Sequence, residues 1–228
     1  MLRACAGSPR NAYRRPEGAP HEAWLWVRAS IVGVARTASL IALLQRRKVG
    51  EEITPEYPNL NEVIANMYDT MYNAYGVGLA APQIGLAIRL FIVDTEPFSE
   101  SDDLTSEEQA ELKGFKRTFI NAKMLKEEGE EWGFNEGCLS IPEVREDVFR
   151  NEKITIEYSD ENFVRKTEVF DGLIARVIQH EYDHIEGILF TDKISSLKKT
   201  LIKKKLQNIM EGKARPDYRM KFAAKKGR

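Results

Sequence analysis

The chain has 228 residues, a formal net charge of -1 and 43% hydrophobic residues, which suits one compact domain with terminal tails. Its two cysteines, Cys5 and Cys138, are too few and too far apart for a disulfide framework, which argues against a secreted, disulfide-rich protein and favours the cytoplasm. No uninterrupted apolar run approaches the roughly 20 residues of a membrane-spanning helix, so no membrane segment is expected.

Residues 1–45 have a composition unlike that of the rest of the chain. They are rich in Arg and Ala and hold only two acids, Glu17 and Glu22. This is typical of an organellar transit peptide, and translation of a stretch foreign to the natural protein would give the same pattern; both interpretations stay open. We expect 1–45 to be an atypical, poorly ordered and dispensable extension, 46–196 the main domain, and 197–228 a basic helix and tail.

The first clear helix is predicted over 59–75. Apolar residues recur there at helical spacing, at Leu60, Val63, Ile64, Met67, Met71 and Ala74. This pattern indicates one face packed on a core. Asn59 or Asn61 is the expected cap, and Gly76 the expected end. Residues 76–83 are expected to form an irregular loop whose glycines let the backbone approach a ligand.

Short strands are expected to follow. The candidate segments are 88–93, 117–120, 144–150, 153–158 and 163–170. Turn-forming residues separate the last three, which favours an antiparallel sheet. The polar stretch 94–114 is expected to be a surface excursion with a helical turn. Asp171 is the expected cap of the next helix, and strands followed by a helix indicate an α+β fold.

That next helix carries two histidines with a glutamate between them. His180 and His184 are four residues apart, so a helix places both imidazoles on one face. Glu181 stands where a carboxylate can act as base on a metal-activated water. Two histidines can fall at this spacing by chance, but the intervening glutamate favours a metal site.

A third metal ligand is required, and the sequence offers few candidates. The metzincin pattern needs a His where Phe190 stands. A Glu from a later helix is a poor alternative, because Glu186 is too close to His184 and Glu211 lies in a lysine-rich segment. Cys138 remains, although a free Cys is more often a buried apolar residue. Three protein ligands and an open position are typical of a catalytic metal site.

Three segments together resemble the signature motifs of the peptide deformylase family. They are Gly76–Gln83, Glu136–Ser140 and Gln179–His184. The resemblance runs from about Arg47 to the end of the chain, although the apolar strand that family members carry before this point is not found. It implies antiparallel β-sheets around a central H-E-x-x-H helix, with a C-terminal amphipathic helix. It also implies hydrolytic removal of the formyl group from the formylmethionine of nascent polypeptides, with release of formate.

The resemblance assigns roles to the metal site. The implied metal ligands are Cys138, His180 and His184. The implied ion is Fe(II), one per chain, which zinc or nickel can replace. Glu181 is the implied base. Glu136 and Asp183 are the expected hydrogen-bond partners of the imidazoles; the alternative is that both acids face solvent.

The resemblance and the helix spacing also predict how substrate is held. The implied oxyanion donors are the Gln83 side chain and the Leu139 backbone N–H. The predicted methionine pocket consists of Leu173 and Val177, which share the helix face of the ligands, and of Val77 and Phe134, which the resemblance adds. The predicted main-chain contacts are Gly78, Gly137 and Arg145.

The C-terminal part is strongly basic. From 197 to 228 there are twelve Lys or Arg against Glu211 and Asp217, and 192–210 is predicted as an amphipathic helix. A basic tail suggests a polyanionic neighbour, here the ribosome. The alternative is a solvated helix face followed by a loose end.

Three other functions remain open at this point. One is a metalloprotease of another H-E-x-x-H class. Another is a cysteine hydrolase in which Cys138 is the nucleophile and His180 the base. The third is a non-catalytic RNA-binding module built on the basic tail, which leaves the three motifs unexplained.

Overall fold

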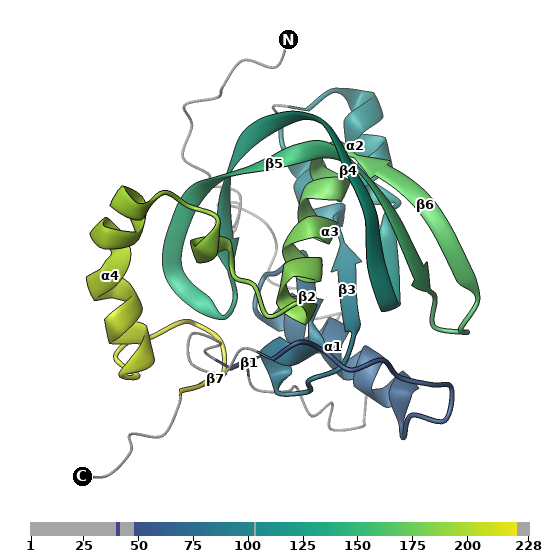
Figure 1. The fold of residues 1–228 in the computed structure, drawn as a ribbon, viewed down its shortest axis with the longest axis horizontal. Coiled ribbons are helices and arrows are strands. Elements are labelled where there is room, and N and C mark those ends of the chain that lie inside the picture. Colours follow the sequence, from purple (N-terminus) through teal and green to yellow (C-terminus); the bar gives the residue numbers. More distant parts are fainter. Residues whose placement is uncertain (1–39, 42–47, 103, 223–228) are drawn as a thin grey trace, which may run out of the picture.

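The computed structural model describes residues 40–41, 48–102 and 104–222, so most of the expected N-terminal extension lies outside the described residues. In chain order the elements are β1 (Leu40–Ile41), α1 (Leu60–Asn73), β2 (Gly78–Ala80), η3 (Ala81–Ile84), β3 (Leu90–Asp94), η4 (Glu96–Glu100), α2 (Ser106–Lys113), β4 (Lys116–Cys138), β5 (Ile141–Ser159), β6 (Arg165–Asp171), α3 (Gly172–Ile185), η5 (Phe190–Asp192), α4 (Ser196–Met210) and β7 (Met220–Lys221). Among these residues, five strands form one antiparallel sheet in the order β2-β3-β4-β5-β6. With α3 at the centre of the curved strands (Figure 1), the predicted α+β fold is confirmed.

The predicted helix at 59–75 is present as α1, but its ends differ from the prediction. Asn59 has a φ of 55° and makes no side-chain capping hydrogen bond, and Asn61 lies inside the helix. The helix ends at Asn73, three residues before Gly76, and the N–H of the C-cap residue Ala74 bonds to carbonyls of the last turn. Its two core methionines are fully buried, as the spacing predicts.

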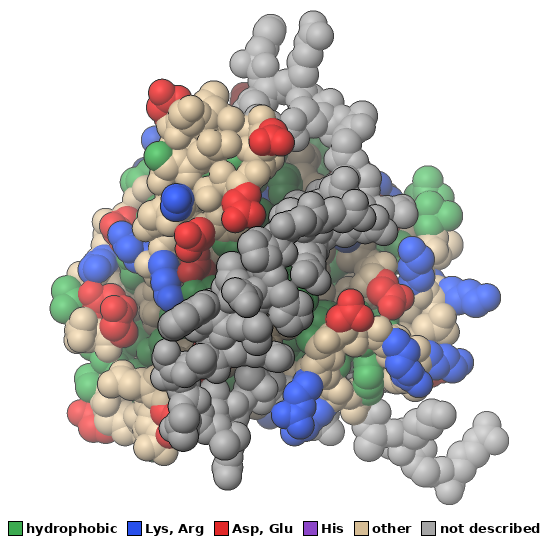
Figure 2. Space-filling view, turned by 180° about the vertical axis from the view of Figure 1, so that it is seen from behind, with side chains coloured by type: hydrophobic (Ala, Val, Ile, Leu, Met, Phe, Trp, Pro, Cys, Tyr) green, Lys and Arg blue, Asp and Glu red, His purple; other side chains and the backbone are tan. Residues whose placement is uncertain are grey.

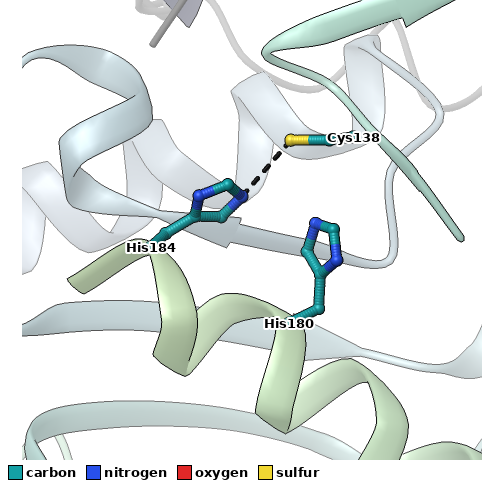
Figure 3. Close-up of side chains that lie close together, drawn as sticks. All are labelled: Cys138, His180 and His184. Carbon is teal, nitrogen blue, oxygen red and sulfur yellow. Dashed lines mark hydrogen bonds between the residues drawn. The ribbon is translucent and has the colours of Figure 1, made fainter. Parts of the chain in front are cut away.

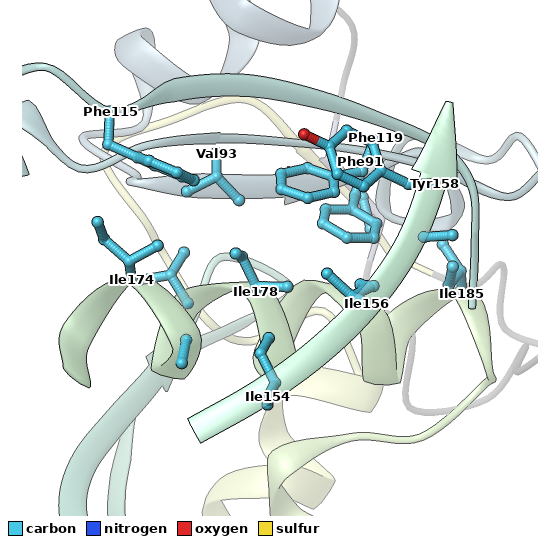
Figure 4. Packing of buried hydrophobic residues seen from close by; sticks show 14 of the residues in the cluster. Phe91, Val93, Phe115, Phe119, Ile154, Ile156, Tyr158, Ile174, Ile178 and Ile185 are labelled. Atoms are coloured by element: carbon cyan, nitrogen blue, oxygen red, sulfur yellow. The ribbon is translucent and has the colours of Figure 1, made fainter. Parts of the chain in front are cut away.

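β3 is buried on both faces, as its uninterrupted apolar run predicts. Phe91 and Val93 belong to the hydrophobic cluster around α3, whereas Leu90 and Ile92 belong to the cluster around α1. The alternation follows from the two-residue period of a strand. Figure 4 shows the apolar face of α3, with Ile178 near its middle, packed against these strands. The sheet and α3 are therefore held together by one continuous core.

β4 and β5 are much longer than predicted. The prediction gave a short strand at 117–120 and separate strands at 144–150 and 153–158, but β4 has 23 residues and β5 has 19. Register shifts interrupt the pairing without ending it, and such irregularities bend a ladder. The prediction was wrong because cross-strand pairing, for example of Asn151 with Glu131, keeps a turn-forming sequence extended.

Three further segments also differ from the prediction. Residues 76–83, expected as an irregular loop, contain β2 and η3. Asp171 precedes α3 but makes no side-chain capping bond, and Gly172 begins the helix with a φ of 54°, a conformation that favours glycine. Within 94–114 the structure has η4 and α2, and α2 begins with a capping box at Thr105.

The C-terminal helix is present as α4, inside the predicted range 192–210, and the Ser195 side chain caps it. Beyond α4 the chain returns toward the sheet (Figure 1), where Met220 pairs with Leu40 in the parallel β1–β7 ladder. Leu40 is 1% exposed, so one short strand from the range 1–45 completes this edge of the domain. Among the described residues, none of the helices combines the length and apolar character needed to cross a membrane.

Candidate metal centre

The β4–β5 hairpin brings a cysteine to the face of α3. Cys138 ends β4 and pairs with Ile141, the first residue of β5, so the turn between them is tight. His180 and His184 lie one turn apart on α3, with ring centroids 5.0 Å apart. The Cys138 Sγ lies 3.3 Å from Nε2 of His184, and the ligand atoms of all three residues lie within 4.8 Å of one another. Figure 3 shows the sulfur and the two rings gathered on one side of α3.

These donors fit one divalent ion. Metal–ligand bonds of about 2.0–2.3 Å in tetrahedral sites place neighbouring donor atoms roughly 3.5 Å apart, close to the 3.3 Å between Cys138 and His184. Burial lowers the pKa of His184 well below its usual value, which favours the neutral imidazole that a metal requires. Within the described part of the chain, this is the one group of Cys, His, Asp and Glu that converges in this way.

Glu136 orients the first imidazole, as predicted for a hydrogen-bond partner. Its carboxylate is 4% exposed and lies 2.9 Å from Nδ1 of His180, which leaves Nε2 for a metal. Arg150 donates to the same carboxylate at 2.7 and 3.0 Å, and Arg176 donates at 3.2 Å. Burial alone would raise the pKa of Glu136, but the hydrogen bonds from His180 and Arg150 hold this pKa far below its usual range. Glu136 is therefore a buried, ionised anchor for the ring.

Asp183 does not contact an imidazole, contrary to the prediction. It accepts from Arg150 at 2.7 Å and pairs with Lys193 at 3.3 Å. At 6% exposure it does not face solvent either. Adjacent residues of a helix point about 100° apart, so Asp183 is turned away from His184. Asp183 accepts a hydrogen bond from Arg150, and Arg150 in turn binds Glu136, the residue that contacts His180.

The sequence analysis missed both arginines of this network. Arg176 lies one turn before His180 on α3 and is 2% exposed; it also donates to the Trp132 carbonyl at 2.6 Å. Arg150 projects from β5 and is 3% exposed. Arg176 stands among apolar residues of the predicted helix. A cation buried there needs a buried anion as partner, so this position could have predicted the ion pair. Arg150 carries no comparable signal in its sequence context.

Glu181 lies on the metal face of α3 in a closed environment. It is 4% exposed, and within the described part of the chain its Oε2 atom has no hydrogen-bond partner. Burial raises its pKa to about 7. Gly78 of β2 lies directly against it, since a Cβ atom there would fall 2.7 Å from the Glu181 Cγ. The glycine therefore leaves the space that the carboxylate occupies.

Gln83 has its side chain fixed toward the cysteine turn. Its Oε1 accepts from the Ala80 N–H at 2.7 Å, and its Nε2 donates to Ser140 Oγ at 3.3 Å and to Cys138 Sγ at 3.6 Å. Gln83 is 1% exposed. The next residue of the turn, Leu139, has its carbonyl bonded at 2.8 Å by the Tyr218 hydroxyl. The two predicted oxyanion donors thus lie around the same short turn.

The predicted methionine pocket is brought together around one apolar cluster. Val77, Leu173 and Val177 all pack in the cluster between α3 and the sheet. Phe134 joins them through Phe98, with ring centroids 6.5 Å apart. The sequence analysis missed Phe98 because it stands in a polar stretch; a lone aromatic residue there was the available signal.

The predicted main-chain contacts lie on two strands. Gly137 and Arg145 are cross-strand partners, and the Arg145 guanidinium covers Gly137 and donates to the Asn135 carbonyl. Gly78 lies on β2, against Glu181 rather than beside Arg145. Gly137 directly precedes Cys138 on β4, so the two glycines lie next to two different residues of the site.

A helix-borne His-Glu-x-x-His pair completed by a cysteine, within an α+β fold, defines a metal-dependent hydrolase. The profile of the polypeptide deformylase family matches residues 43–200. The chain belongs to this family, whose enzymes remove the N-terminal formyl group from nascent polypeptides, and it is a hydrolase of that kind.

Individual relatives agree with this assignment. The chain is 78% identical over 180 residues to the peptide deformylase of Flavobacterium psychrophilum, covering 79% of this chain and 93% of the relative. It is 76% identical over 183 residues to that of Flavobacterium johnsoniae, covering 80% and 93%. A crystal structure of a peptide deformylase from Legionella pneumophila matches with a TM-score of 0.65 and 34% identity, covering 78% of this chain and 98% of that chain.

Proposed function

We propose that Cys138, His180 and His184 hold one Fe(II) ion, which zinc or nickel can replace. The observation that supports this most directly is the convergence of one sulfur and two imidazole nitrogens within 4.8 Å. Glu181, on the same helix face, has a buried carboxylate oxygen for which the described residues offer no hydrogen-bond partner. A bound divalent ion would lower the pKa of water, from 15.7 to about 7 in zinc sites, and would polarise the formyl oxygen.

Glu181 is the general base and then the general acid of the reaction. It takes a proton from the attacking water and returns it to the amine nitrogen as the formyl C–N bond breaks, so that formate and a free N-terminus result. Because burial raises the pKa of Glu181 to about 7, the carboxyl can accept and release a proton near neutral pH.

Gln83 and Leu139 stabilise the negative charge that develops on the formyl oxygen. The Gln83 amide cannot turn freely, since Ala80 holds its oxygen, and its nitrogen faces the cysteine turn. The Leu139 backbone N–H is the second donor. Donors fixed in advance are effective because they need no reorganisation, and the loss of one typically costs about 3–4 kcal/mol.

The substrate methionine side chain lies against the apolar cluster beside the metal position. The residues that receive it are Val77, Phe134, Leu173 and Val177. Gly78, Gly137 and Arg145 bind the peptide main chain. The supporting observation is that Val77, Leu173 and Val177, distant in sequence, meet in one cluster with Phe98, whose ring contacts that of Phe134.

The basic helix α4 docks the enzyme on the ribosome in the cytoplasm, where nascent chains emerge. Lys203, Lys204 and Lys205 are exposed, and Figure 2 shows Lys and Arg side chains gathered on the side of the molecule that carries α4. Replacement of these three lysines by Glu is expected to reduce ribosome co-sedimentation and leave hydrolysis of short formyl-Met peptides unchanged. Equal co-sedimentation would overturn the docking role alone.

The base assignment is tested with Glu181→Gln. We expect formate release from a formyl-Met peptide to fall about 10²–10⁴-fold while one ion per chain is retained. Glu130→Gln is the matched control, because Glu130 is exposed on β4. Wild-type activity in Glu181→Gln would contradict the proposal.

A cysteine hydrolase is the second candidate: the sequence predicts His180 as its base, and the 3.3 Å contact of Cys138 Sγ is with Nε2 of His184, which would also suit a thiolate–imidazole pair. Its nucleophile would be the sulfur itself. Such an enzyme would keep its activity after metal removal, whereas the proposed metal site would lose it.

A further inference from the structure

The segment after α4 reaches the turn that carries Cys138. Tyr218 donates its hydroxyl to the Leu139 carbonyl at 2.8 Å, across 79 residues of sequence. This hydrogen bond joins the C-terminal segment to the residue whose N–H we assign as an oxyanion donor. The phenol is partly buried, and burial raises its pKa, so it remains a protonated donor at neutral pH.

The Leu139 residue is also held through its side chain. Leu139 packs on the hydrophobic cluster of α1, together with Tyr218 and Leu40. Its Cδ1 atom presses on Gly76, where a Cβ atom would fall only 2.7 Å away. Leu139 is thus fixed by its side chain on one side and by its carbonyl on the other, and the carbonyl contact depends on one hydroxyl.

The C-terminal segment itself is anchored on both sides of Tyr218. Ala214 is buried and, together with Met220 and Phe222, packs in the cluster that includes Cys138 and the start of β5. Leu40 donates its N–H to the Arg219 carbonyl at 3.1 Å in the β1–β7 ladder. Tyr218 therefore projects from a segment with a fixed position, which allows its hydroxyl to restrain the turn.

We propose that Tyr218 is a positioning residue for deformylation: its bond to the Leu139 carbonyl holds the 139–140 peptide plane, and together with the packed Leu139 side chain this restrains the Leu139 backbone and the direction of its N–H. This inference rests on the proposed role of Leu139. An oxyanion donor acts only when its N–H points at the developing charge, and a misplacement of about 1 Å can cost about 10²-fold in rate. The C-terminal segment is in this way part of the catalytic apparatus without touching substrate.

The test is Tyr218→Phe, which keeps the ring and removes the hydroxyl. Tyr68→Phe is the matched control, because the Tyr68 hydroxyl contacts Thr118 at 3.4 Å at the opposite end of β4. Metal content, thermal unfolding, kcat and KM for a formyl-Met peptide are measured on both variants and on Glu181→Gln.

We expect kcat of Tyr218→Phe to fall about tenfold, with KM and metal content within about twofold of wild type, since the contact acts on the transition state. Tyr68→Phe keeps wild-type kcat. An unchanged kcat, a rise in KM alone, or a loss that follows metal content or unfolding would overturn the role of Tyr218. Full activity of Glu181→Gln would instead overturn the proposed mechanism, so the two failures are distinguishable.

Discussion

His180 and Glu136 are joined by a hydrogen bond of 2.9 Å between Nδ1 and a carboxylate oxygen, and that carboxylate is also bound by Arg150 and Arg176. The contact fixes the ring so that its other nitrogen faces Cys138 and His184. Hydrogen-bond partners of this type commonly raise metal affinity by about 10–100-fold. Glu136 therefore belongs to the proposed metal site together with its three proposed ligands.

Replacement of Glu136 by Gln is expected to weaken metal binding about 10–100-fold. The neutral amide no longer compensates the charges of Arg150 and Arg176 and holds the His180 ring less firmly. Competition with a chelator of known affinity measures the change. Glu130→Gln, on the exposed part of the same strand, is the control and should bind as wild type does; equal affinity in both variants would show that Glu136 plays no such role.

Metal affinity is expected to rise with pH. Burial lowers the pKa of His180, but its hydrogen bonds with Cys138 and Glu136 outweigh this and raise the pKa well above its usual value. Without metal the ring therefore holds a proton, which binding must release. Calorimetric titration in two buffers of different ionisation enthalpy reports the release. Identical binding enthalpies in the two buffers would contradict the expectation.

Glu181→Gln is expected to stabilise the metal-free protein at pH 8. Burial raises the Glu181 pKa from 4.5 to about 7, so between these values the folded state binds more protons than the unfolded chain. Stability then falls as pH rises through this window and stays lower above it. At about 1.4 kcal/mol for each unit of pKa shift, burial of Glu181 lowers the free energy of unfolding at pH 8 by about 3 kcal/mol.

Urea unfolding of the metal-free wild type and Glu181→Gln, at pH 5 and pH 8, measures this effect. The variant should gain stability at pH 8 and much less at pH 5. An equal gain in the free energy of unfolding at both pH values would mean that burial of the ionised Glu181 carboxylate does not destabilise the protein.

Gly78→Ala is expected to lower kcat about 10²-fold while leaving metal content unchanged. The added Cβ would lie 2.7 Å from the Glu181 Cγ and would displace the carboxylate, and displacements of about 1 Å can have this effect. Gly114→Ala is the control, because the nearest atom to its added Cβ is 3.8 Å away. Steady-state kinetics of both variants measure the effect. A wild-type kcat in Gly78→Ala would show that this glycine does not position the Glu181 carboxylate.

The parts of the fold that the sequence predicted well are those with strong local signals. The period of α1, the apolar run of β3 and the His-Glu-x-x-His spacing of α3 each depend on neighbours within a few residues. Cys138, His180 and His184 could be predicted to lie together because metal-ligand chemistry restricts the candidates to few residue types.

The remaining features depend on contacts between distant segments. The length of β4 and β5 is set by cross-strand pairing, which local turn signals at Asn151 do not reveal. The orientation of Asp183 follows from the helix phase and from Arg150, a residue with no marked signal in the sequence. The contact of Tyr218 with Leu139 joins segments that only the tertiary fold brings together.

The central claim is that a metal held by Cys138, His180 and His184 is required for deformylation. The most direct measurement is formate release from a formyl-Met peptide by anaerobically prepared protein, before chelation, after chelation and after addition of Fe(II). The account predicts one ion per chain, loss of activity on chelation and its return with Fe(II), and no activity in Cys138→Ser at any stage. Formate release that persists at the wild-type rate in fully metal-free protein would contradict it.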